Sequence, residues 1–83
     1  MPTVLRFDGL RVLIYPNDHR PPHVHVIGPG REAVFVLNRR QEGVLLRENF
    51  GFNTRELRSI AAVLDQNWTK LHLAWEVFHG DYG

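Results

Sequence analysis

The alternation of apolar and polar positions near the start of the chain predicts a β-hairpin. Residues 4–7 and 10–15 are apolar-rich runs joined by an Asp-Gly dipeptide, whose residues tolerate the positive φ of a two-residue hairpin loop. In that register Arg6 lies opposite Arg11, on the face turned away from the core. Because like charges then oppose each other, the pair predicts an anionic neighbour, either a glutamate of the chain or a bound phosphate.

A second hairpin is predicted after a proline-rich loop. Residues 23–27 and 32–38 are apolar-rich runs, separated by the turn sequence Gly-Pro-Gly-Arg, which is read as a four-residue loop. The later strand is apolar on both faces, which is typical of a strand that is covered on both. We expect one face to lie under a helix and the other to be covered by loops or by a second copy of the protein. Residues 44–47 are the candidate for a short fifth strand.

The last third of the chain predicts an amphipathic helix over residues 54–79. Asn53 is a good N-cap residue, and Glu56 three positions later completes a capping-box pattern. Gly80 is typical of a helix end. The apolar positions recur at alternating steps of four and three residues, as on one face of a helix: Leu57, Ala61, Leu64, Trp68, Leu71, Trp75 and Phe78.

The predicted helix is too long for the predicted sheet. It would extend about 39 Å at 1.5 Å per residue, whereas a five-residue strand spans about 17 Å. We therefore expect either a break near Asn67, with the two halves folded back on each other, or a second half that packs against another chain. The predicted fold class is α+β, with an antiparallel sheet of four or five strands formed from two consecutive hairpins and one long C-terminal helix. A chain of 83 residues is expected to form a single domain, over residues 1–83.

Composition excludes several classes of function. The sequence contains no cysteine, so neither a disulfide nor a thiolate metal site is expected. The formal net charge of +1 differs from the strongly basic balance of a typical nucleic-acid-binding domain. No apolar run approaches the roughly 20 residues of a membrane-spanning helix, and the first residues lack an apolar segment of the signal-peptide type. We therefore expect a cytoplasmic protein without a membrane partner.

The candidate chemistry lies in the segment from Pro21 to Val26. The prolines restrict the backbone, and strand alternation places His23 and His25 on one face, about 7 Å apart. Two imidazoles in this arrangement are suited to share a divalent cation or a phosphate. Zinc requires three or four ligands, and three further residues are candidates to complete the set: His19, Asp18 and Glu32. Of these, His19 is nominated with His23 and His25 as the candidate metal site.

Three other interpretations remain open. The histidines either stabilise the turn by hydrogen bonds to loop carbonyls, or act as base and acid in metal-independent RNA cleavage, with Arg20, Arg6 or Arg11 stabilising the anionic transition state. Alternatively, the domain binds itself or a protein partner through apolar residues of the helix: Trp68, Trp75 and Phe78. His72 and Glu76, one helical turn apart, are expected to form an exposed pair without a functional role.

Three stretches of the chain resemble a known family. They are Met-Pro-Thr-Val-Leu-Arg at the start, Pro-Pro-His-Val-His-Val at residues 21–26, and Glu-Leu-Arg, Ala-Trp-Glu and Phe-His-Gly in the late helix. In this order they are similar to short bacterial proteins of domain-of-unknown-function family 4160. The resemblance implies a gene that is paired with a small partner gene, as in toxin–antitoxin modules, and either a binding or a nuclease role. The loop before the motif is usually acidic in that family, whereas residues 17–20 here read Asn-Asp-His-Arg, with an additional histidine and a basic residue. The resemblance therefore assigns no acidic metal ligands to this loop.

Taken together, the sequence predicts a small interaction protein that binds a partner or itself. The alternative is a site centred on His23 and His25, either for a metal such as zinc or for cleavage of RNA. The sequence assigns no catalytic residue beyond these candidates.

Overall fold

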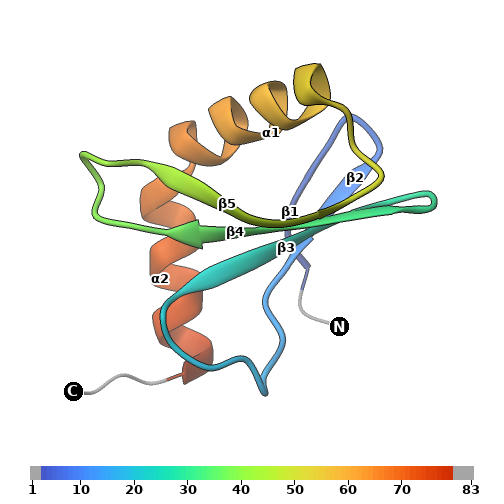
Figure 1. Ribbon diagram of the computed structural model, residues 1–83. Coiled ribbons are helices and arrows are strands. Elements are labelled where there is room, and N and C mark those ends of the chain that lie inside the picture. The colour runs from blue at the N-terminus through green and yellow to red at the C-terminus, as the bar shows by residue number, and fades with distance from the viewer. Residues whose placement is uncertain (1–2, 80–83) are drawn as a thin grey trace.

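The computed structural model describes residues 3–79, which form an α+β fold with one antiparallel sheet and two helices (Figure 1). The five strands lie side by side in chain order, as consecutive hairpins require. The elements are β1 (Thr3–Phe7), β2 (Leu10–Leu13), β3 (His23–Gly28), β4 (Arg31–Leu37), β5 (Val44–Phe50), α1 (Thr54–Gln66) and α2 (Trp68–His79). No helix within residues 3–79 is long and apolar enough to cross a membrane.

Both predicted hairpins are confirmed. Asp8 and Gly9 adopt φ angles of 50° and 75°, and the loop between β1 and β2 has the two residues predicted. Arg6 pairs with Arg11 as expected. The loop between β3 and β4 is shorter than predicted, because the last residue of β3 pairs with the first residue of β4 and only two residues remain between them.

The fifth strand is confirmed and is longer than the predicted residues 44–47. It continues to Phe50 because a β-bulge lets it stay paired with β4. Leu46 lies opposite Phe35 and Glu48 lies opposite Val34, so Arg47 is the extra residue in the bulge. This insertion changes which side chains of β5 share a face of the sheet.

One face of the sheet packs against both helices and forms the core. Val24 and Val26 of β3 are fully buried there, as their alternation with the histidines predicts. The capping box at Asn53 and Glu56 is also confirmed and fixes the start of α1. The helices contribute four buried side chains to this core: Ile60, Leu64, Leu71 and Trp75.

The opposite face is covered in part by the loop between β2 and β3. Leu13 shares this face with its neighbour His25 and is nevertheless fully buried. Val34, the partner of His25 in β4, is buried as well. The predicted cover over the second face of β4 is therefore supplied, at this end, by a loop of the same chain.

The prediction of one long helix was wrong. The alternative of a break near Asn67 is confirmed, although the two halves do not fold back on each other as a pair. The backbone N–H of Asn67 still donates to the carbonyls of Val63 and Leu64, and its side-chain amide donates to Val63 O at 2.8 Å. The chain then turns into α2, which crosses behind the strands at a steep angle to α1 (Figure 1). The turn brings both halves of the apolar stripe onto one short sheet, which a straight helix would overhang.

The break also changes the predicted interface on the helix. Trp75 is fully buried in the core, so the fold leaves none of its surface for a partner. Trp68 is partly buried and donates its indole N–H to Asn38 O at 2.9 Å. Phe78 is exposed. The predicted helix end at Gly80 lies outside the described residues.

Candidate functional site

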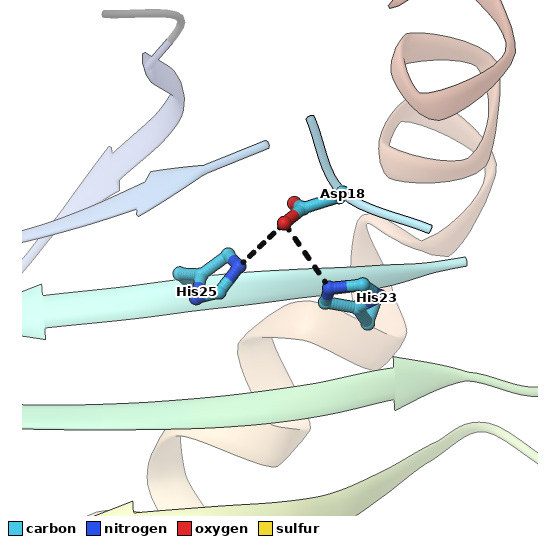
Figure 2. Close-up of side chains that lie close together, drawn as sticks. All are labelled: Asp18, His23 and His25. Carbon is cyan, nitrogen blue, oxygen red and sulfur yellow. Dashed lines mark hydrogen bonds and ion pairs between the residues drawn. The ribbon is translucent and has the colours of Figure 1, made fainter. Parts of the chain in front are cut away.

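A surface pocket of about 280 Å³ opens where the loop between β2 and β3 meets the open face of the sheet. Asp18 reaches into it from the loop, and His23 and His25 reach into it from β3 (Figure 2). The pocket is lined by Asn17, Asp18, His19, Arg20, His23, His25, Val34, Arg47 and Glu48.

One carboxylate oxygen, Asp18 Oδ1, lies close to both imidazole rings. Asp18 Oδ1 lies 3.3 Å from His25 Nε2 and 3.4 Å from His23 Nε2 (Figure 2). The side chains of Asp18, His23 and His25 are only 12%, 8% and 14% exposed. Three polar groups therefore converge on one point that is largely screened from water.

The other oxygen of the carboxylate is fixed by a tight turn over residues 15–18. Asp18 Oδ2 accepts the backbone N–H of Tyr15 at 3.0 Å, and the backbone N–H of Asp18 donates to Tyr15 O at 3.0 Å. The sequence favours this turn, because Pro16 takes the second position, where its fixed φ is suited. The turn thus aims Oδ1 at the histidines.

A backbone carbonyl determines the tautomer of His23. Its Nδ1 lies 2.8 Å from Pro21 O, and since a carbonyl only accepts, Nδ1 must carry the proton. In the neutral ring the lone pair is then on Nε2 and faces Asp18 Oδ1. The Arg20–Pro21 peptide bond in the lead-in is cis. Behind the ring lies the indole of Trp75, with ring centroids 5.3 Å apart.

His25 has a carboxylate behind it instead of a carbonyl. Its Nδ1 lies 3.6 Å from Glu32 Oε2, which is longer than a hydrogen bond. This nitrogen is buried and has no hydrogen-bond partner within residues 3–79. The ring is packed edge-on against Tyr15, with centroids 4.6 Å apart, and against His23, with centroids 5.3 Å apart. Both imidazoles are therefore held in place by their surroundings.

The electrostatics of the cluster favour a cation between its members. In neutral His23 the lone pair on Nε2 and Asp18 Oδ1 are both acceptors, so they repel when nothing positive lies between them. His25 Nε2 lies within hydrogen-bond distance of the same oxygen. In a buried site the repulsion is poorly screened. A tetrahedral zinc ion with bonds of about 2.0–2.1 Å separates its ligand atoms by about 3.3 Å, which matches the two distances from Asp18 Oδ1. All three ligand atoms lie within 4.8 Å of one another.

The sequence model of DUF4160, a domain of unknown function, matches residues 9–76. The chain belongs to this family. The match covers most of the chain, from the start of β2 to late α2, and includes the loop and strand that build the pocket. No curated protein and no solved structure gives a significant match to the chain.

The DUF4160 domain brings together only some of the residues that the sequence nominated. His23, His25 and Asp18 converge, while Glu32 lies behind His25. His19 and Arg20 line the same pocket but are exposed and stand outside the group of ligand atoms. His19 was therefore wrong as the third member of the candidate metal site, and Asp18 takes that place.

Other candidates lie away from the pocket. Arg6 and Arg11 line a separate hollow next to Gly28 and Pro29 at the β1 side of the sheet, and the anionic neighbour predicted for them stays a prediction. His72 and Glu76 form the predicted pair on α2, with His72 Nδ1 3.5 Å from Glu76 Oε2. His72 also stacks on Trp68.

Three contributors to the pocket were missed from the sequence. Tyr15 anchors Asp18, and the turn residues that follow it are the signal that would have revealed this role. Arg47 and Glu48 reach the pocket from β5. Their position depends on the bulge opposite Val34 and Phe35, for which the sequence carries no clear signal.

Proposed function

We propose that this DUF4160 domain binds a divalent transition metal, with zinc as the best match, through Asp18 Oδ1, His23 Nε2 and His25 Nε2. The observation that carries the proposal is the convergence of both Nε2 atoms on one carboxylate oxygen at 3.3 and 3.4 Å, with Nδ1 of His23 committed to Pro21 O. The neutral His23 ring therefore directs its Nε2 lone pair at the shared point, and His25 Nε2 lies within hydrogen-bond distance of the same oxygen. A metal ion there would replace these contacts with three bonds.

The surroundings of the three ligands support the same conclusion. Histidines that bind metals usually donate their other ring N–H to a carbonyl or a carboxylate, which orients the ring. Pro21 O stands in that place for His23, and the Glu32 carboxylate lies on that side of His25. Tyr15 N–H holds the second oxygen of Asp18. The ligands are therefore oriented before any ion arrives.

The ligand types narrow the choice of metal. Two imidazoles and one carboxylate suit zinc and its neighbours in the first transition row, whereas calcium and magnesium prefer sites made of oxygen atoms. Three protein ligands leave one tetrahedral position open, as in catalytic rather than structural zinc sites.

The test is a zinc titration of the purified protein by calorimetry, with thermal unfolding alongside. Zinc should bind at one equivalent and raise Tm, because it binds the folded state. His25→Ala should weaken binding by more than about a hundredfold, beyond the range expected for outer-shell partners. His72→Ala is the matched control, since it removes a histidine that also faces a carboxylate, and it should bind zinc like the wild type. Absence of a stoichiometric site, or equal loss in both variants, would overturn the proposal.

An RNA-degradation assay on the same purified protein distinguishes metal binding from metal-independent RNA cleavage. If the histidines act alone as acid and base, RNA should be degraded in the presence of a chelator and spared by His25→Ala. The metal proposal expects no cleavage under those conditions.

A second candidate function is self-association through β5, which is an edge strand of the sheet. Leu45, Leu46 and Phe50 are 58%, 40% and 62% exposed on it. The bulge places Leu45 and Phe50 on the same face, because they pair with Val36 and Glu32, which are four residues apart in β4. Long edge strands with exposed apolar side chains are prone to pair with another strand.

The sequence of β5 is complementary to itself in one antiparallel register. When Arg47 of one copy lies opposite Glu48 of the other, Leu45 also lies opposite Phe50. Opposite charges and apolar side chains then pair across a two-fold axis. This self-pairing supports the prediction of a protein that binds itself. The prediction of a toxin–antitoxin-like partner stays a prediction.

The molar mass in solution, measured by light scattering during size-exclusion chromatography, tests this second candidate function. The wild type should have the mass of a dimer, and Phe50→Glu should give a monomer because it places a carboxylate opposite Leu45. Val77→Glu replaces another well-exposed apolar residue, on α2, and should leave the dimer intact. A monomeric wild type, or a dimer that survives Phe50→Glu, would contradict it.

A further inference from the structure

We propose that the open position on the metal takes an oxygen of a phosphate group, held against the pocket wall by Arg47. This inference rests on the proposed metal site and names the class of ligand for it. Three observations support it: the shape of the pocket, the charge of its lining, and the position of Arg47 in the β5 bulge.

The three metal ligands lie in the wall of an accessible pocket and not in a closed core. The pocket has a volume of about 280 Å³, which leaves room for a small ligand beside an ion at Asp18. A tetrahedral ion with three protein ligands presents its fourth position to the open side. A ligand entering the pocket would therefore meet the metal directly.

The charges of the lining favour an anion. Asp18 and Glu48 supply two carboxylates, and Arg20 and Arg47 supply two guanidinium groups, so the side chains other than histidine balance. A divalent ion then gives the pocket a net charge of about +2 when the histidines are neutral. In a partly enclosed site such a charge attracts anions strongly.

The chemistry of arginine narrows the anion to an oxyanion, with phosphate as the best match. The planar guanidinium offers a fork of N–H donors that matches two oxygens of a phosphate. A third phosphate oxygen remains for the metal. Divalent ions and arginines bind phosphate groups together in many sites, because both neutralise its charge.

The bulge in β5 accounts for the position of Arg47 in the pocket wall. Arg47 is the extra residue between Leu46, opposite Phe35, and Glu48, opposite Val34. β-Bulges redirect a side chain and are frequent beside functional sites. Here the redirected side chain lines the pocket that contains His23 and His25. The irregularity of the strand thus has a role at the site.

The experiment titrates phenyl phosphate and, separately, inorganic phosphate into the zinc-loaded protein by calorimetry. Both should bind, while phenol, which lacks the anionic group, should not. Tighter binding of phenyl phosphate than of inorganic phosphate would identify a phosphate ester as the natural ligand class, and the reverse order would identify the free ion. The metal-free protein should bind either ligand at least about tenfold more weakly, since the metal supplies one of the bonds.

Variants separate the contribution of Arg47 from that of general charge. Arg47→Ala should weaken phosphate binding roughly tenfold by removing charge-assisted hydrogen bonds, and Arg47→Lys should recover only part of the loss. Zinc affinity should change less than about twofold in both, because Arg47 is not a metal ligand. Arg58→Ala removes the same charge from α1, outside the pocket, and should bind phosphate like the wild type.

The outcomes distinguish this inference from the proposal beneath it. If zinc binds but phosphate does not, or if Arg47→Ala and Arg58→Ala weaken it equally, the inference fails and the metal site stands. If zinc does not bind, both fail.

Discussion

Two groups of histidine and carboxylate in this domain have similar distances and different surroundings. On α2, His72 lies 3.5 Å from Glu76, and the two side chains are 30% and 46% exposed. At the pocket, His23 and His25 lie 3.4 and 3.3 Å from Asp18 and are mostly buried. Each group also has a tryptophan beside a ring, Trp68 on α2 and Trp75 at the pocket. Distance alone would therefore rank them as equals.

The two clusters differ in how many neighbouring atoms hold each side chain in place. A helical turn makes His72 and Glu76 neighbours, and such i,i+4 pairs contribute only a few tenths of a kcal/mol. At the pocket the anchors come from two parts of the chain: Tyr15 N–H and Pro21 O lie in the loop between β2 and β3, and Glu32 lies in β4. A site for a ligand requires side chains that are held in one geometry before the ligand binds. The comparison teaches that the anchors, and not the pair distance, identify the site.

The largest expected effect comes from the tryptophan behind the pocket. Trp75→Ala should lower the free energy of unfolding by about 3–5 kcal/mol, because it empties a large volume in a closed core. Phe78→Ala, one turn further along the same helix, should cost less than about 1 kcal/mol because Phe78 is exposed. Urea denaturation measures both. Similar costs for the two variants would mean that α2 does not pack as described.

Much of the fold could be predicted because its signals are local. The Asp-Gly loop, the capping box at Asn53 and the alternation of His23 with Val24 each specify a structure within a few residues. The helix break could not be assigned in the same way. The apolar stripe continues in register through Asn67, and only the length of the sheet selects two helices over one.

The part of the site that depends on local sequence signals was predictable, and the rest was not. Strand alternation placed His23 and His25 on one face, but which loop residue joins them depends on the turn at residues 15–18. Periodicity does not extend into loops, so the sequence nominated His19 with the two histidines, whereas the structure brings Asp18 to them. Arg47 was missed because a bulge is decided by packing between β4 and β5. The predicted interface at Trp75 shows that an apolar stripe alone does not distinguish a core from a contact surface.

An intermediate effect is expected at the carboxylate behind His25. Glu32→Gln should weaken zinc binding about tenfold, at the low end for outer-shell partners, because Glu32 is partly exposed and 3.6 Å from the ring. Glu48→Gln removes the same charge from the pocket wall on β5 and is the matched control. Calorimetric titration with zinc should rank the two variants. If Glu48→Gln weakens binding as much, the effect is one of overall charge, and the anchor at His25 is not needed.

The smallest effect is expected for the exposed pair of His72 and Glu76 on α2. Glu76→Gln should lower the free energy of unfolding by less than about 0.5 kcal/mol, as for an exposed i,i+4 pair, and should leave zinc affinity unchanged. Asp18→Asn makes the equivalent change at the pocket. It should abolish tight zinc binding, because an amide oxygen carries no charge and is a poor ligand for zinc beside two imidazoles. A loss of zinc binding in Glu76→Gln would show that exposed pairs bind the metal too, and the importance assigned to the anchors would then be wrong.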